Sequence, residues 1–257
     1  MQKDEYLRHY FLQENHWWFV TRRNIILDII DRFIPKKENY KIVDLGCCTG
    51  GMLKYLTGYG AVYGVDSSEE ALTFCKREGL RNLKKAKIEN TQYPAETFDL
   101  VLGLDILEHC DDDLAALREI FRICKKGGHC ILTVPAYKFM FSDHDVAAHH
   151  KRRYGFRGLR SKFEKIGFSI IRATYFNTLL FPLAVCFRGT HNLLKPFCFR
   201  KNIDTDFVYE VPGFLNMIFG IIFGLEKYLL RILNLPFGLS LLCIAYKGSC
   251  KEEIERK

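Results

Sequence analysis

The order of hydrophobic and polar positions divides the chain into segments of helical and of extended period. Apolar residues recur at helical spacing from Ile25 to Phe33, and Pro35 then ends the pattern. After this point, short apolar runs alternate with amphipathic stretches as far as Tyr175. The pattern predicts one helix that leads into a series of alternating strands and helices.

This alternation is typical of β-α-β units. We predict strands at Lys41–Leu45, Ala61–Val65, Phe98–Leu104, His129–Val134, Phe168–Tyr175 and Ser240–Tyr246. We predict helices at Gly51–Leu56, Glu69–Arg77, Asp112–Cys124 and Gly155–Ile166, with the acids Asp111, Asp112 and Asp113 at a helix N-terminus. Such units form an α/β fold whose sheet is mostly parallel, with helices on both faces and ligands at the carboxyl ends of the strands.

A segment of different composition, Thr178–Gly238, separates the last two predicted strands. It holds nine of the 21 phenylalanines of the chain. Within it, Phe214–Leu225 is nearly all apolar, but Glu226 and Lys227 end that run after twelve residues, whereas a membrane-spanning helix needs about twenty. A helix over Phe214–Leu233 would either be buried, as in a lid or dimer contact, or lie in a membrane interface.

Composition excludes several classes of protein. With 257 residues, of which 48% are hydrophobic and 26% charged, the chain fits neither a disordered protein nor a bundle of transmembrane spans. The ten cysteines include no C-x-x-C pair, and Met1–Tyr10 lacks the apolar core of a secretory signal. We therefore expect a cytoplasmic, reducing location and thiols that act as small buried hydrophobes.

These patterns suggest a division of the chain into four parts. An N-terminal helical cap (1–39) precedes an α/β core (40–177), the aromatic insert (178–238) follows, and the last strand and a charged tail (239–257) end the chain.

The strongest chemical signal is a glycine-rich turn between the first predicted strand and the next helix. The run Val43–Gly51 contains Asp44, Gly46 and Gly50, and glycines there let the backbone approach a ligand closely. Sixteen residues after Gly50, Asp66 ends the second predicted strand. A carboxylate at that place can accept hydrogen bonds from the two hydroxyls of a ribose, so the pattern predicts an adenosine-containing ligand.

The turn resembles the first motif of class I S-adenosylmethionine-dependent methyltransferases, whose usual form is D/E-x-G-x-G-x-G. Further parts of the chain match that family in order, and the resemblance extends from Ile42 to Pro135: the matching parts are Asp66, Phe98–Val101, Leu107–His109 and Lys126–Gly128. The resemblance implies a Rossmann-like, doubly wound sheet of seven strands with the last one antiparallel, and S-adenosylmethionine as cofactor. It implies cofactor contacts at Asp44, Gly46, Cys48, Gly50, Asp66, Ser67 and Asp105.

Two positions depart from the family pattern. Cys48 stands where the middle glycine of the motif usually lies, which adds a side chain beside the cofactor loop. Lys87 takes the place where relatives often have an acid that contacts adenine, so this contact would fall to Ile88 or to the backbone.

Methyl transfer needs a positioned acceptor, exclusion of water and, for a protonated acceptor, a general base. The chain has a dense group of titratable residues after the fifth strand, from Ser142 to Tyr154. We predict that His144 or His149 orients or deprotonates the acceptor and that Asp105 lines the site. His144 and His149 are five residues apart, which does not suit one helical face, so we predict no metal site.

The residues that would select an acceptor leave alternatives open. Trp17 and Trp18 either stack on an acceptor or adenine, or seal a core. A basic run carries seven cations, opposed locally by Glu164 alone, and suits either phosphates of a substrate or lipid, or a plain solvated surface; its members are Lys151, Arg152, Arg153, Arg157, Arg160, Lys162 and Lys165.

The predicted partners follow from these features. We expect a small-molecule or lipid- or glycan-linked acceptor and an anionic membrane surface, with Arg188, Lys195, Arg200 and Lys201 helping to hold that surface. The net charge of +8 suits anionic partners, but no motif for sequence-specific nucleic-acid binding accompanies it. The alternatives are a non-catalytic nucleotide-binding protein of the same fold and a nicotinamide-dependent reductase, whose usual G-x-G-x-x-G fingerprint differs from this turn.

Overall fold

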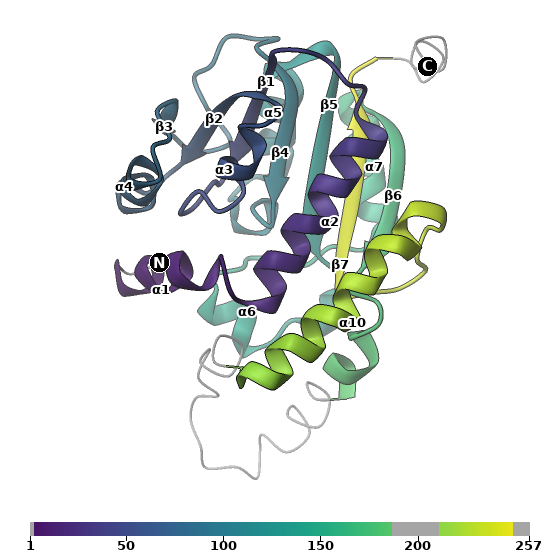
Figure 1. The fold of residues 1–257 in the computed structure, drawn as a ribbon. Helices are drawn as coiled ribbons and strands as arrows, with labels where there is room; N and C mark the ends of the chain where they lie inside the picture. Colours follow the sequence, from purple (N-terminus) through teal and green to yellow (C-terminus); the bar gives the residue numbers. More distant parts are fainter. Residues whose placement is uncertain (1–2, 187–210, 249–257) are drawn as a thin grey trace.

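The chain folds around one seven-stranded sheet, shown by a computed structural model that describes residues 3–186 and 211–248 (Figure 1). The strands are β1 (Tyr40–Leu45), β2 (Gly60–Asp66), β3 (Leu83–Lys85), β4 (Phe98–Leu104), β5 (Cys124–Pro135), β6 (Ser169–Phe176) and β7 (Ser240–Tyr246). Their order across the sheet is β3-β2-β1-β4-β5-β7-β6. The pairs among β1 to β5 are parallel, whereas β7 runs antiparallel between β5 and β6. The predicted seven-stranded, doubly wound α/β fold is confirmed.

Helices cover both faces of this sheet. They are α1 (Lys3–Leu12), α2 (Trp17–Phe33), α3 (Leu53–Leu56), α4 (Glu69–Arg77), α5 (Asp113–Ile123), α6 (Asp143–Ala147), α7 (Phe156–Ile166) and α10 (Gly213–Ile232), with short 3-10 turns at Leu107–His109 and Lys138–Met140. Helices α2 and α10 lie side by side on one face, and α5 and α7 lie on the other (Figure 1).

The sheet has a hydrophobic core on each face, and successive residues of the central strands belong alternately to one core and to the other. In β4, Leu100 and Leu102 pack with α2 and α10, whereas Val101 between them packs with α5 and α7. In β1, Ile42 and Val43 divide in the same way. Because successive side chains of a strand point to opposite faces, a central strand covered on both sides is apolar at most of its positions.

Local sequence sets several element boundaries. Asp112 accepts hydrogen bonds from the amides of Leu114 and Ala115 and caps α5, as predicted for an acid at this terminus. Ser68 caps α4 through the amide of Ala71. Gly167 ends α7 with φ of 105°, a backbone conformation that a residue without a Cβ adopts most easily.

The structure also differs from the expected element bounds. Strand β5 begins at Cys124, whereas the sequence pattern predicted a strand that begins at His129. Helix α3 covers only Leu53–Leu56 of the predicted Gly51–Leu56. Helix α1 and strand β3 were not predicted, because the first has little hydrophobic periodicity and the second is three residues long. The fold places the reversal of strand order between β1 and β4, and ligands of such sheets bind at the carboxyl ends beside this reversal.

The aromatic insert is described in part. Its predicted helix Phe214–Leu233 is confirmed as α10, Gly213–Ile232, which packs against α2. The basic residues Arg188, Lys195, Arg200 and Lys201, and most of the charged tail, lie outside the described residues.

Candidate functional site

The glycine-rich turn leaves β1 at the carboxyl edge of the sheet. Gly46 and Gly50 have φ of 73° and 87°, which disfavours residues with a Cβ. A Cβ at Gly46 would lie 2.5 Å from the side chain of Ile106. The amides of Gly46 and Cys47 donate to the carbonyl of Val65, at 2.7 and 3.0 Å, so the turn is held against the end of β2.

Asp66 faces this turn from the end of β2. Its Oδ2 accepts a hydrogen bond from the amide of Cys48 at 3.0 Å, and its Oδ1 accepts one from the amide of Ser68 at 2.9 Å. Desolvation raises the pKa of Asp66, although these backbone donors and that of Ser67 oppose the rise. Each carboxylate oxygen retains a lone pair, so Asp66 is oriented and still able to accept from a ribose hydroxyl.

Cys48 occupies a position that suits glycine. Its φ is 47°, in the left-handed region where a side chain is disfavoured. The Cys48 sulfur lies 3.7 Å from Nδ1 of His9 in α1. Burial raises the pKa of the Cys48 thiol to about 12, so this thiol is neither a nucleophile nor a charge beside the cofactor loop.

Helix α1 covers the turn, an arrangement that the sequence did not indicate. His9 Nδ1 lies 3.1 Å from the Thr49 hydroxyl, which in turn donates to Gln13 Oε1 at 2.7 Å. Tyr6 packs with Ala71 of α4. Burial, helped by the charge of Arg22, lowers the pKa of His9 to about 4, so this imidazole is neutral and forms part of the cover over the turn.

The next strand end adds Asp105, which follows β4. Asp105 forms an ion pair with Arg22 of α2 and accepts a hydrogen bond from the Thr133 hydroxyl at 3.0 Å. On β1, burial raises the pKa of Asp44 to about 7, an effect that Arg22 opposes and Asp66 adds to. The guanidinium of Arg22 therefore lies near both Asp105 and Asp44, and sequence reasoning had not singled out Arg22 as their partner.

Glu108, in the 3-10 turn after Asp105, is fully buried. Neither of its carboxylate oxygens has a hydrogen-bond partner among the described residues. Burial, and then the negative charge of Asp105, raise the pKa of Glu108 well above its ordinary value. His150 Nε2 is 3.9 Å from Glu108 Oε1, and His109 completes a group whose possible ligand atoms all lie within 4.8 Å of one another.

His150 is held by a second buried carboxylate. Asp145 Oδ1 lies 2.9 Å from His150 Nδ1 and accepts a hydrogen bond from Arg153 Nε at 2.7 Å. Burial alone would raise the pKa of Asp145, but the hydrogen bonds from His150 and Arg153 lower it well below its ordinary value. With Asp145 on Nδ1, the Nε2 atom of His150 is directed toward Glu108.

The predicted histidines, His144 and His149, both precede His150 in the same segment. His149 is exposed and has φ of 57°. His144 is half-buried, with its ring centroid 6.4 Å from that of His150. The assignment of an acceptor role to His144 or His149 stays a prediction, and the residue that the sequence missed is His150, whose only signal was its place within the same titratable run.

The structure distinguishes between the alternatives for the two tryptophans. Trp18 stacks on Phe223 of α10 with centroids 5.3 Å apart, and Trp17 meets Phe219 edge-on at 5.5 Å. Both therefore pack between α2 and α10, as the core interpretation expected. The position of Lys87 is also clear: its ammonium lies at the surface, 3.7 Å from Asp111, while Ile88 is buried in the core.

Most of the basic run has acidic or carbonyl partners from elsewhere in the chain. Lys151 pairs with Asp111, Arg152 and Lys162 with Asp113, Arg153 with Asp145, and Arg160 with Glu164. The sequence showed one opposing acid nearby, whereas the fold supplies three more. This reduces the positive charge available to a phosphate.

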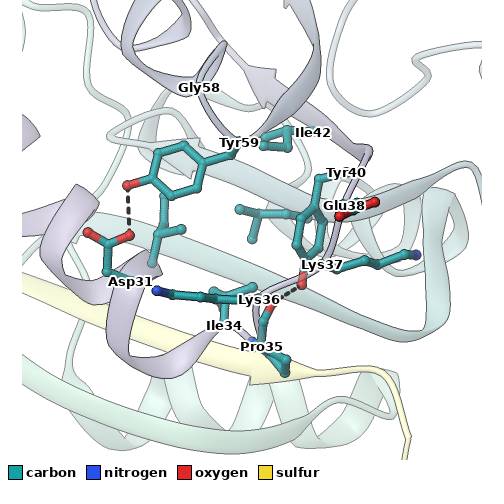
Figure 2. A pocket seen from close by; sticks show the side chains of 12 residues that line it. Asp31, Ile34, Pro35, Lys36, Lys37, Glu38, Tyr40, Ile42, Gly58 and Tyr59 are labelled. Carbon is teal, nitrogen blue, oxygen red and sulfur yellow. Dashed lines mark hydrogen bonds between the residues drawn. The ribbon is translucent and has the colours of Figure 1, made fainter.

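A cavity of about 350 Å³ lies away from these residues (Figure 2). It is lined by Ile34, Pro35, Tyr40 and Tyr59, and the Tyr59 hydroxyl donates to Asp31 at 2.9 Å on its wall. Tyr40 begins β1 and Tyr59 precedes β2, so the cavity is at the amino ends of the strands. Ligands of doubly wound sheets bind at the opposite edge, so we assign it no part in the site.

Comparison with known proteins agrees with this geometry. Residues 43–132 match the family described as "Methyltransferase domain". The chain is 37% identical over 110 residues to an uncharacterized methyltransferase of Schizosaccharomyces pombe, covering 36% of this chain and 39% of that protein. It is 31% identical over 117 residues to a ubiquinone biosynthesis O-methyltransferase of Aliivibrio fischeri, covering 42% and 47%.

Solved structures extend the likeness to most of the chain. A S-adenosylmethionine-dependent methyltransferase from Archaeoglobus fulgidus superposes with a TM-score of 0.56 at 18% identity, covering 91% of this chain and 97% of that one. At this identity the likeness concerns the fold. The chain spans less than half the length of the two curated relatives.

Proposed function

We propose that this chain, which belongs to the class I S-adenosylmethionine-dependent methyltransferase family, transfers a methyl group from S-adenosylmethionine to an acceptor bound beside β4. The family predicted from the sequence is confirmed, and with it the cofactor class. The observation that carries the proposed activity is a set of four carboxylates at the carboxyl edge, of which Asp44 and Glu108 are buried and Asp66 and Asp105 are half-buried.

The charge of this edge suits a cationic cofactor. Asp44 and Glu108 have raised pKa values because they are buried, and the adjacent carboxylates Asp66 and Asp105 add to this cost. A sulfonium cation would relieve the repulsion, whereas the pyrophosphate of a nicotinamide dinucleotide would increase it. The alternative of a nicotinamide-dependent reductase is therefore disfavoured.

The residues present fit the cofactor. Asp66 is held by two backbone donors with lone pairs left for the ribose hydroxyls, and the turn at Gly46 and Gly50 presents backbone without side chains. Asp44 and Asp105 would face its cationic groups, and Arg22 its carboxylate. When bound, the cofactor supplies a methyl group on a positive sulfur, which needs no covalent catalysis from the protein.

The chain's own residues would position the acceptor and manage its proton. Helix α1 covers the loop and excludes water, while Asp105, Glu108 and His150 present carboxylate and imidazole atoms at the end of β4. An acceptor hydroxyl or amine placed there would be within reach of these atoms. We keep His144 and His149 as candidates for contacts at the outer side of the acceptor.

Calorimetry with S-adenosylmethionine and with its demethylated product tests the proposal first. Binding of both, followed by incorporation of labelled methyl into an acceptor fraction, is expected. No binding of either compound would contradict the enzyme and the non-catalytic binding protein alike. Binding without turnover on any acceptor fraction would favour the non-catalytic alternative.

We also propose that the acceptor is lipid-linked and that α10 lies in the membrane interface. The helix is long and apolar enough to cross a membrane, and little of it is buried inside the protein. Exposed apolar side chains recur at helical spacing along its outer face: Phe214, Met217, Ile218, Ile221, Leu225, Tyr228 and Ile232. A continuous exposed apolar stripe of this kind is typical of a helix that docks on lipid.

The inner face of α10 supports an interfacial position over a spanning one. Asn216 Oδ1 accepts a hydrogen bond from the amide of Trp17 at 2.8 Å, Glu226 accepts one from the amide of Leu179 at 2.7 Å, and Arg231 pairs with Asp28. These polar contacts attach the helix along its length to the α/β core. A spanning helix would have to break them and place their charges in hydrocarbon.

Vesicle flotation tests the membrane proposal. The chain is expected to float with vesicles of anionic lipid, and the variant Ile221→Glu, which changes an exposed side chain, is expected to float at least 10-fold less. Phe11→Glu provides a matched control, because Phe11 is similarly exposed, at 65% against 58% for Ile221, but lies on α1. Failure of the unaltered chain to float would remove the proposal and leave the methyl-transfer proposal unaffected.

A further inference from the structure

We propose that Glu108, His109 and His150 bind a divalent transition-metal ion, with Zn²⁺ as the best match, next to the acceptor position. The possible ligand atoms of the three side chains lie within 4.8 Å of one another. Two imidazoles and one carboxylate are a common set for zinc sites that keep one position open. The proposal replaces the sequence-based expectation that the chain has no metal site, which considered His144 and His149.

The unpaired carboxylate of Glu108 is the first reason. Its side chain is fully buried, and neither oxygen has a hydrogen-bond partner among the residues that the structure describes. A buried carboxylate without partners costs free energy unless it is neutralised or coordinates an ion. The nearest basic atom is His150 Nε2, at 3.9 Å, which is too far for a hydrogen bond and leaves room for an ion between them.

The second reason is that His150 has an outer partner. His150 Nδ1 lies 2.9 Å from the buried Asp145 carboxylate. Histidines that bind metals usually donate their other ring N–H to a carboxylate or carbonyl, which orients the free nitrogen toward the ion. The free Nε2 atom of His150 is directed toward Glu108, and a ring nitrogen of His109 lies within 4.8 Å of both.

The backbone holds the two ligand-bearing segments together. The amide of Lys151 donates to the carbonyl of Glu108 at 2.9 Å, and the hydroxyl of Tyr154 donates to the carbonyl of Leu107 at 3.1 Å. The three ligand groups are therefore fixed to one another before an ion binds. Ligands of a tetrahedral Zn²⁺ lie roughly 3.3 Å apart, so small side-chain rotations complete the site.

One coordination position remains for solvent or an acceptor. The His150 side chain is 13% exposed, so the group is reached from outside. This part rests on the proposed function: an acceptor hydroxyl bound to the ion would lose its proton more easily, and His150 would then act as a ligand rather than as a base. The ion would also offset the repulsion between Asp105 and Glu108.

Titration of untagged, chelator-treated protein with Co²⁺, in the absence of S-adenosylmethionine, tests the site, because Co²⁺ reports its ligands by absorption. One equivalent is expected to bind with a spectrum that lacks thiolate charge transfer, and Zn²⁺ is expected to displace it. Glu108→Gln and His150→Ala are each expected to weaken binding at least 10-fold, and His149→Ala, which alters an exposed neighbour, to weaken it less than 2-fold.

Three results would overturn the proposal: no stoichiometric binding, a thiolate spectrum, or equal affinity in the unaltered chain and in His150→Ala. If Glu108→Gln does not fold, His150→Ala alone decides, because the His150 ring is only partly enclosed. Binding of S-adenosylmethionine is measured separately on metal-free protein. Failure to bind the metal ion can therefore be distinguished from failure to bind S-adenosylmethionine.

Discussion

The two halves of the carboxyl edge are built in different ways. The cofactor half is a continuous piece of chain, because Asp44, the glycine-rich turn and Asp66 lie within 23 residues. The acceptor half is assembled from two segments separated by 32 residues, Asp105–His109 and Ser142–Tyr154. The first half can be read as a motif, whereas the second exists only once the chain has folded.

The halves also differ in how they hold their acids. Desolvation dominates on the cofactor side and raises the pKa of Asp44 to about 7. In the acceptor half, donors from His150 and Arg153 lower the pKa of Asp145 despite its burial. In the acceptor half, Asp105 is paired with Arg22 and Asp145 with Arg153, whereas neither carboxylate oxygen of Glu108 has a hydrogen-bond partner among the described residues.

The largest expected effect is on the cofactor half. Asp66→Ala removes the carboxylate that we propose to accept hydrogen bonds from both ribose hydroxyls, so S-adenosylmethionine should bind about 1000-fold more weakly, a loss of roughly 4 kcal/mol. Calorimetry measures this, with Asp111→Ala as control, since Asp111 is a solvent-exposed acid. Unchanged affinity in Asp66→Ala would show that the turn does not bind a ribose.

The second largest effect is expected in the acceptor half, where the effects of replacing His150 and His149 on kcat are compared. His150→Ala is expected to lower kcat about 100-fold, roughly 3 kcal/mol, with little change in cofactor affinity, because its imidazole is the one directed at Glu108. His149→Ala should have a smaller effect, since that side chain is exposed. The reverse order in a methyl-transfer assay would favour the histidines chosen from sequence alone.

The pH dependence of stability tests the cofactor half without a ligand. The pKa of Asp44 rises from an ordinary value of 3.8 to about 7 in the folded protein, so the folded state holds a proton that the unfolded state releases. Its contribution to the free energy of unfolding should fall by about 2 kcal/mol between about pH 5 and pH 7. Asp44→Asn should remove that fall.

Denaturant unfolding at several pH values, compared between the unaltered chain and Asp44→Asn, gives the difference. Asp145 predicts the opposite sign, because its pKa is lowered: its contribution is present at neutral pH and is lost as the pH falls below about 4. If the free energy of unfolding of Asp44→Asn still falls between about pH 5 and pH 7, the fall belongs to a titratable group other than Asp44.

The smallest expected effect concerns Cys48. Its φ of 47° disfavours a side chain, so Cys48→Gly should relieve strain, but glycine also adds entropy to the unfolded chain. The net change in the free energy of unfolding should be below about 1 kcal/mol, whereas Cys48→Val should destabilise more, because β-branched residues tolerate this conformation least. Thermal unfolding of the two variants makes the comparison.

Much of the fold could be predicted because it depends on local periodicity. The bounds of α4, β4 and β7 match the predictions residue for residue. Each of these elements is long enough to show its period, and caps such as Ser68 mark where it begins. Helix α1 could not be predicted in this way, because its place depends on contacts of Tyr6 and His9 with α4 and the turn.

The sequence by itself determined six of the seven strands, the glycine-rich turn and Asp66, since these follow from the order of apolar residues and from one short motif. Only the tertiary structure decided that His150 is the histidine facing Glu108, that Arg22 pairs with Asp105, and that the tryptophans seal the contact between α2 and α10. The physical reason is distance along the chain. The hydrophobic period of a helix or strand depends on residues close together in the sequence. The partner of a buried charge depends on which distant segment the fold brings next to it.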